Sequence, residues 1–99
     1  MIKHIVLFKL QEFENEAAKE AKQKEIKLGL EKLENIIPEL KSIEVGINSN
    51  PEENFDIALS TTFNSMEDLA TYAKHPDHLA VSKILRAVLE SRSCVDFEI

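Results

Sequence analysis

Residues 2–10 carry large apolar side chains on both faces of a predicted strand. Val6 and Phe8 lie at the centre of one face, and Ile5 and Leu7 at the centre of the other. A strand with one face in water would alternate apolar and polar residues, so both faces of this one should be covered. In a chain this short, helices can cover only one face of a sheet. We therefore expect a second copy of the chain, or a ligand, to cover the other face.

Apolar residues at helical spacing predict a long helix over residues 14–37. Ile26, Leu30 and Leu33 recur at spacings of four and three. The opposite face alternates acidic and basic residues and is expected to face solvent. Pro38 ends the helix, because its ring cannot continue the hydrogen-bond ladder.

Two further helices are predicted on either side of Pro76. Ser65 can accept a hydrogen bond from the free amides of a helix that runs to residue 74. Pro76 ends that helix, because the residue before a proline disfavours helical geometry. A second helix is expected over residues 77–91, where these apolar residues recur at helical spacing: Val81, Ile84, Leu85, Val88 and Leu89.

Three more segments, residues 41–48, 55–63 and 94–99, alternate apolar and polar side chains and predict strands. The polar residues 48–54 form a loop by composition. The resulting order is strand, helix, strand, strand, two helices and strand. This order predicts an α+β, ferredoxin-like β-α-β-β-α-α-β fold, with a four-stranded antiparallel sheet that carries its helices on one face. We expect a single domain over residues 1–99.

Charge and composition exclude several classes of partner. With 12 basic and 18 acidic residues, the formal net charge is −6, so nucleic acid is not expected as a partner. No stretch approaches the roughly 18 apolar residues that span a bilayer, and the apolar run near the start is too short for a signal peptide. Cys94 is the single cysteine, which suits a reducing compartment, and we expect it to be a buried, inert thiol. These features predict a soluble, cytoplasmic protein.

The candidate chemistry is concentrated between Tyr72 and His78. A histidine, with a pKa of about 6.5, can act as a general base near neutral pH. A phenol can donate a hydrogen bond to an oxygen on which enolate charge develops. His78 and Tyr72 are therefore the candidate catalytic pair for removing a proton beside a carbonyl group. His4 and His75 are candidate ligand-binding residues.

Each of these residues also has a structural interpretation. Tyr72 can be a core aromatic residue whose hydroxyl bonds a backbone carbonyl. His78 can make a structural hydrogen bond near the start of its helix, and His75 can be a hinge residue before Pro76. His4, in an apolar strand, can be an interior histidine with satisfied ring nitrogens.

No metal or organic cofactor is expected. His75 and His78 have a spacing that occurs in zinc sites, but the proline between them prevents the single helical face that such a pair needs. Further ligands would have to come from His4, Asp56 or Cys94. The two glycines of the chain stand apart, so no glycine-rich loop is present to hold a phosphate group.

Several short motifs together resemble one known family. They are residues 1–9, Ile36-Ile37-Pro38, Val45-Gly46, Phe55-Asp56-Ile57-Ala58-Leu59, and Tyr72 followed by His75-Pro76-x-His78. In combination they resemble the stress-responsive α/β-barrel domain family over nearly the whole chain. The resemblance implies a dimeric α+β barrel in which the sheets of two copies pack together. That arrangement agrees with a first strand that is apolar on both faces.

A plant polyketide cyclase of that family is similar to this chain at His4, Tyr72, His75 and His78. The similarity implies a cofactor-free aldol closure in which His78 would be the base and Tyr72 would hold the thioester carbonyl. Ile57 departs from the pattern, because it aligns with a further pocket histidine of that cyclase.

We therefore expect a small homodimeric protein whose cavity, between sheet and helices, binds a small apolar carbonyl or polyketide-like ligand. If the protein is an enzyme, it is a cofactor-independent cyclase or isomerase-like lyase with His78 and Tyr72 as its acid–base pair. Two alternatives remain. The cavity can bind a ligand without turning it over, or the protein can be a structural, stress-related dimer whose histidines serve packing.

Overall fold

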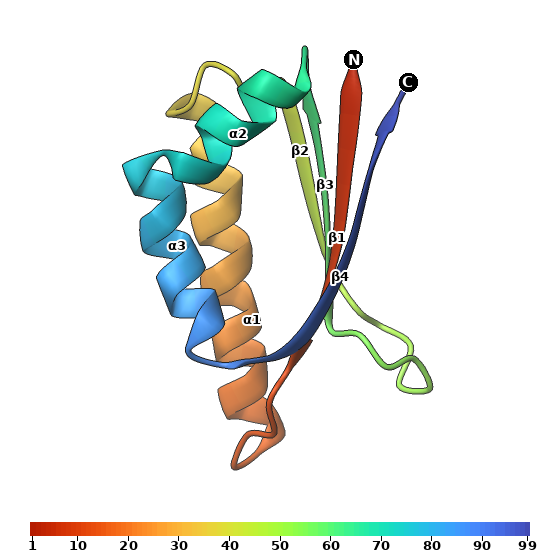
Figure 1. Ribbon diagram of the computed structural model, residues 1–99. Coiled ribbons are helices and arrows are strands. Elements are labelled where there is room, and N and C mark those ends of the chain that lie inside the picture. Colours follow the sequence, from red (N-terminus) through yellow and green to blue (C-terminus); the bar gives the residue numbers. More distant parts are fainter.

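The computed structural model describes all residues, 1–99, as one antiparallel sheet with three α-helices on one face (Figure 1). The elements in chain order are β1 (Ile2–Leu10), α1 (Glu16–Glu31), β2 (Ser42–Ile47), β3 (Ile57–Phe63), α2 (Met66–Lys74), α3 (Pro76–Arg86) and β4 (Leu89–Glu98). The sheet order β2-β3-β1-β4 places the first and last strands side by side. The predicted ferredoxin-like α+β fold is thereby confirmed. None of its helices combines the length and apolar character that crossing a membrane requires.

The first helix is shorter than the predicted span of residues 14–37. The α-helix covers Glu16–Glu31, and a 3₁₀ turn over Lys32–Asn35 follows it. The apolar spacing continues through this turn, because Leu33 and Ile37 are both fully buried. The backbone amide of Ile37 donates to the carbonyl of Leu33 at 2.9 Å. Periodicity therefore located the buried face correctly, although the helix geometry tightens before the predicted end.

The predicted boundary between the last helix and the last strand is wrong. α3 ends at Arg86 and β4 already begins at Leu89, inside the predicted helix 77–91. The amide of Gln11 donates to the carbonyl of Val88 at 2.7 Å, which ties this turn to the end of β1. Apolar residues at these positions fit a helix face and a strand equally well, and pairing with β1 decides between them. No glycine or proline marks the turn in the sequence.

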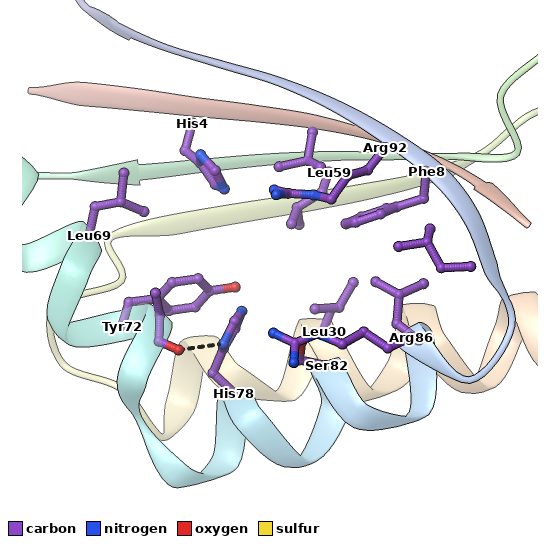
Figure 2. Close-up of a pocket in the computed structure, with 14 residues that line it drawn as sticks. His4, Phe8, Leu30, Leu59, Leu69, Tyr72, His78, Ser82, Arg86 and Arg92 are labelled. Carbon is purple, nitrogen blue, oxygen red and sulfur yellow. Dashed lines mark hydrogen bonds between the residues drawn. The ribbon is translucent and has the colours of Figure 1, made fainter.

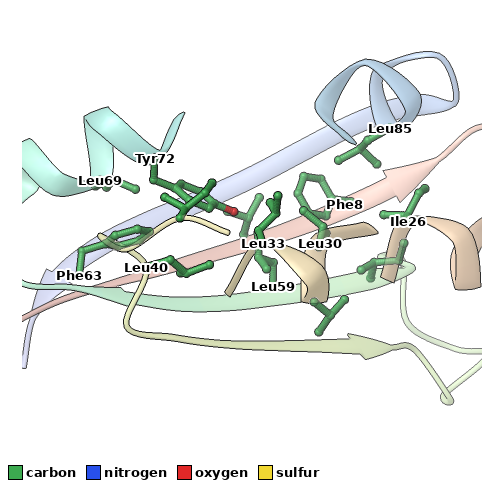
Figure 3. Packing of buried hydrophobic residues seen from close by; sticks show 14 of the residues in the cluster. Phe8, Ile26, Leu30, Leu33, Leu40, Leu59, Phe63, Leu69, Tyr72 and Leu85 are labelled. Carbon is green, nitrogen blue, oxygen red and sulfur yellow. The ribbon is translucent and has the colours of Figure 1, made fainter. Parts of the chain in front are cut away.

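The hydrophobic core lies between the helices and one face of the sheet (Figure 3). α1 contributes Ile26 and Leu30 to it, and the 3₁₀ turn that follows contributes Leu33. Tyr72 and Phe63 are the largest fully buried side chains, and their ring centroids are 5.0 Å apart. This pair holds α2 against β3, because burial of two aromatic rings is a large hydrophobic contribution. The position of Tyr72 is therefore fixed by packing.

The opposite face of the sheet is bare in a single copy of the chain (Figure 1). The register pairs Ile5 of β1 with Val95 of β4, and the alternation of β1 puts Leu7 on the same face. Val95 is 54% exposed and Phe97 is 43% exposed. Adjacent apolar side chains of this size are typical of a surface that another protein covers. The apolar side chains on this face agree with the prediction, made from the two-sided apolar pattern of β1, that both faces of the strand are covered.

The other face of β4 points to the helical side of the sheet. Arg92, Cys94 and Asp96 pair with helix-facing residues of β1 and so share that side. β4 is an edge strand, and no helix packs closely over it (Figure 1). Cys94 is therefore exposed, and the expectation of a buried thiol is wrong.

Candidate functional site

A cavity of about 320 Å³ opens between the helical face of the sheet and helices α2 and α3 (Figure 2). Most of its wall is apolar and comes from Val6, Phe8, Leu30, Leu59, Leu69, Leu85 and Leu89. Its polar side chains are His4, Tyr72, His78, Ser82, Arg86 and Arg92. The volume is at the small end of the range for ligand sites, roughly 300–1,000 Å³. Three of the four predicted site residues therefore face one small cavity.

Tyr72 lies on α2, and its hydroxyl group is buried without a hydrogen-bond partner. Its ring is fixed between Phe63 and His78, at centroid distances of 5.0 and 4.5 Å. Burial raises the pKa of Tyr72 to about 12, so the phenol keeps its proton at physiological pH. A buried hydroxyl normally finds a partner. This one is a free hydrogen-bond donor at the cavity wall.

His78 lies in the first turn of α3, and its Nδ1 is 3.0 Å from the carbonyl oxygen of Ala73. A carbonyl only accepts, so Nδ1 carries a proton and donates it. The neutral ring then has its unprotonated nitrogen at Nε2, on the side away from Ala73. Figure 2 shows this edge of the ring turned toward the cavity. The helix termini around Pro76 thus fix both the orientation and the tautomer of His78.

The pKa of His78 is lowered, and the largest cause is desolvation by burial. The hydrogen bond to the carbonyl of Ala73 acts in the opposite direction, because it stabilises the protonated ring. Coulomb interactions with His4, Arg86 and Arg92 lower the pKa of His78 further. The ring is therefore neutral at pH 7 and able to accept a proton at Nε2.

His4 reaches the cavity from the sheet side. The register of β1 and β4 places it opposite Asp96, and Nδ1 of His4 is hydrogen-bonded to a carboxylate oxygen of Asp96. Since a carboxylate accepts, this contact fixes the ring with Nε2 toward the cavity. Figure 2 shows His4, Tyr72 and His78 directed into the same space from β1, α2 and α3.

His75 does not line this cavity. It is the N-cap residue of α3, and its Nδ1 accepts a hydrogen bond from the backbone amide of Asp77 at 3.1 Å. Pro76 follows as the first helical residue, where a proline is well tolerated. This geometry accords with the structural alternative for His75, and nothing in it supports the predicted role in ligand binding.

Sequence reasoning missed Arg86, Arg92 and Asp96. Arg86 and Arg92 line the cavity, and Asp96 orients His4. Two signals were present in the sequence: the chain has only these two arginines, and Arg86 is two turns of helix beyond His78. The contribution of β4 depends on strand register, which no local pattern reveals.

The residues weighed as metal ligands do not converge. The structure brings together no group of three or more histidine, cysteine, aspartate or glutamate side chains able to share an ion. The buried Asp56 instead accepts a hydrogen bond from the amide of Leu10 at 2.8 Å and pairs with Lys19 at 2.9 Å. The side chains of the cavity that can exchange a proton are those of His4, Tyr72 and His78.

Comparison with known proteins places the chain among relatives of the same size and fold. Olivetolic acid cyclase of Cannabis sativa is 29% identical over 97% of this chain and 94% of its own length. A stress-response A/B barrel domain-containing protein of Arabidopsis thaliana is 30% identical over 98% of this chain and 85% of its own. A crystal structure of a dimeric, ferredoxin-like protein of unknown function from Bacteroides fragilis is 43% identical, with a TM-score of 0.94 over 99% of this chain and 95% of that one.

The sequence model of one protein family, the stress responsive A/B barrel domain, matches residues 2–99, which is almost the whole sequence. The match confirms the resemblance carried by the opening strand and by the Tyr72 to His78 segment. The chain belongs to the stress responsive A/B barrel domain family.

Proposed function

We propose that the cavity binds a small carbonyl compound, and that His78 and Tyr72 act on it as a base and an acid. The observation that carries this proposal is the pair of unused groups in one cavity. The hydroxyl of Tyr72 is buried without a partner, and Nδ1 of His78 is bound to Ala73, which leaves Nε2 free. A structural tyrosine or histidine would use these groups within the fold.

The reaction follows from the two protonation states. Nε2 of His78 takes a proton from the carbon next to the carbonyl group. Negative charge then develops on the carbonyl oxygen, and the phenol of Tyr72 donates a hydrogen bond to it. The apolar wall supports this step, because electrostatic contacts are stronger where water is excluded. The enolate can then attack a second carbonyl of the same molecule, and the alkoxide that forms takes back the proton held by Nε2 of His78, which completes the ring closure of a cyclase.

The similarity to olivetolic acid cyclase supports this class of reaction. The cavity volume of about 320 Å³ favours a substrate of modest size. We therefore propose a cofactor-independent cyclase or isomerase-like lyase that acts on a small carbonyl or polyketide-like compound. The reaction as proposed uses only side chains of the chain itself.

Exchange of carbon-bound protons tests this proposal. The protein is incubated in heavy water with 4-phenyl-2-butanone, and loss of the proton signal next to the carbonyl is followed by NMR. His78→Gln is expected to lower the protein-dependent exchange rate by about 100-fold or more, which is the usual loss for a general base. Tyr72→Phe is expected to lower it as well, because the oxygen then lacks its donor.

His75→Gln is the matched control, since it changes the same residue type outside the cavity. Its exchange rate should equal that of the unchanged protein. If the unchanged protein does not exceed the buffer rate, or if His78→Gln exchanges as fast, the proposal is wrong.

We also propose that the functional unit is a homodimer joined through the bare face of the sheet. Val95 and Phe97 supply exposed apolar surface there, and the similar structure from Bacteroides fragilis is dimeric. Phe97→Lys would place a second lysine opposite Lys3 and should give monomers in sedimentation velocity. Cys94→Ser, on the other face of β4, should leave the dimer intact. A Phe97→Lys protein that still sediments as a dimer would exclude this interface.

A further inference from the structure

The only two arginines of the chain line the same cavity. The sequence has ten lysines, and none of them lines it. Neither Arg86 nor Arg92 forms an ion pair with a carboxylate of the chain. Both guanidinium groups therefore keep their full set of donors for another molecule.

Their placement follows from two independent features of the fold. His78, Ser82 and Arg86 are spaced four residues apart on α3, so they share one helix face, and all three line the cavity. Arg92 pairs with Phe8 across β4 and β1, which turns it to the helical side of the sheet. Figure 2 shows Arg86 extending along α3 toward Ser82 and His78, and Arg92 extending from β4 toward His4.

The local charge is opposite to that of the chain. The formal net charge is −6, yet no aspartate or glutamate lines the cavity. Asp96, the acid that lies nearby on β4, is hydrogen-bonded to His4. Both arginines are close enough to His78 for their charges to disfavour its protonation. An acidic protein thus presents a positively charged pocket beside its candidate base.

We propose that the molecule bound here is a small oxo-carboxylate, whose carboxylate group contacts Arg86 and Arg92 while its carbonyl oxygen contacts the hydroxyl of Tyr72. This inference rests on the proposed function and specifies the substrate class. Guanidinium groups bind carboxylates through two parallel hydrogen bonds, which fixes the orientation of the ligand. The apolar wall holds the part of the molecule between its two polar ends.

The arginines also serve the chemistry. Removal of a proton next to the carbonyl adds a negative charge to a molecule that already carries one. The same proton transfer leaves His78 positively charged and close to both arginines. Repulsion from their charges disfavours the protonated ring unless a negative charge lies nearby. A bound carboxylate offsets the positive charge of the arginines and makes proton transfer to His78 easier. Neutral ketones lack this compensation, so their protons should exchange above the buffer rate but more slowly than those of an oxo-carboxylate.

A pair of probes of similar size and shape, one a carboxylate and the other neutral, tests the proposal. Binding of 4-oxo-4-phenylbutanoate and of its neutral amide, 4-oxo-4-phenylbutanamide, is followed through the NMR signals of the His78 ring in the unchanged dimeric protein. The carboxylate should bind at least about tenfold more tightly, a difference of about 1.4 kcal/mol. Arg86→Gln and Arg92→Gln should each weaken carboxylate binding and leave amide binding unchanged. The double variant should bind both probes equally.

Lys83→Gln is the matched control, because it removes one positive charge from an exposed position of α3 that does not line the cavity. It should keep the preference for the carboxylate. Equal affinity of the two probes for the unchanged protein, binding of neither probe at millimolar concentration, or an undiminished preference in the double variant would each overturn the inference.

The inference and the proposed function fail in different ways. His78→Gln should abolish proton exchange but keep the carboxylate preference, read from the Tyr72 signals. A carboxylate preference without any proton exchange in the unchanged protein would retain the anion site and reject the catalytic role. Proton exchange on ketones without any carboxylate preference would retain the catalytic role and reject the anion site.

Discussion

The buried hydroxyl group of Tyr72 should lower the free energy of unfolding of the protein. It is buried without a hydrogen-bond partner, and such a group loses its bonds to water at a cost of about 1–3 kcal/mol. Tyr72→Phe removes the hydroxyl but keeps the ring that packs against Phe63. We therefore expect the free energy of unfolding to rise by about 1 kcal/mol, the low end of that range, because removing the oxygen leaves a small gap.

Urea denaturation, followed by circular dichroism, measures this change. The protein concentration must be held constant, because the stability of the proposed dimer would depend on it. The midpoint should move to higher urea with an unchanged slope. The same variant should lose proton exchange on the ketone, so stability and activity would change in opposite directions.

Thr61→Val is the matched control for a hydroxyl that does have a partner. Thr61 is also fully buried, and its hydroxyl donates to the carbonyl oxygen of His4 at 3.4 Å. Its loss should lower the free energy of unfolding by about 1 kcal/mol. If Tyr72→Phe also destabilises the protein, the Tyr72 hydroxyl has a partner within the fold, and the argument that it is reserved for a ligand is wrong.

Two further predictions concern the histidines of the Tyr72 to His78 segment. Burial lowers the pKa of His78 below 6.5 in the folded protein, so the unfolded chain binds a proton at this residue more readily. The free energy of unfolding is therefore highest above pH 6.5, where the ring is neutral in both states, and it decreases as the pH falls toward the lowered pKa. Denaturation midpoints measured between pH 7.5 and pH 5 should therefore fall less in His78→Gln than in the unchanged protein, and identical pH profiles would contradict the lowered pKa. His75→Ala should lower the free energy of unfolding by about 0.5–2 kcal/mol through loss of the α3 N-cap, whereas His75→Asn, a good capping residue, should retain it. A change in ligand affinity in His75→Asn would show that His75 does more than cap the helix.

Local pattern was sufficient for most of the fold. Alternation located the strands, and the double-sided apolar pattern of β1 indicated a sheet with something on each face. The error at the end of α3 has a physical cause. Val88 and Leu89 satisfy the helical spacing of α3, but Leu89 pairs with Leu10 of β1 and the carbonyl of Val88 accepts a hydrogen bond from Gln11. Only the complete sheet decides between helix and strand at these positions.

The site was partly predictable for the same reason. Tyr72 and His78 belong to one short segment, so their proximity could be inferred from the chain itself. His4 joins them from the opposite layer, as the family resemblance implied. Arg92 and Asp96 reach the site only because β4 pairs with β1 in one particular register. That register depends on contacts between the two ends of the chain, which no local pattern encodes.

The strand β4 has a different environment on each side. Its alternate residues place Asp96 beside His4 at the cavity and Phe97 on the bare face where we propose that a second copy binds. This one strand therefore takes part both in the proposed association of two copies and in the proposed binding of a ligand. Any free energy by which the dimer orders this strand also orders the cavity, and thermodynamic reciprocity requires a ligand to strengthen the dimer by the same factor. Affinity for a ligand in this protein would then depend on protein concentration, and a dilute sample would bind more weakly than a concentrated one.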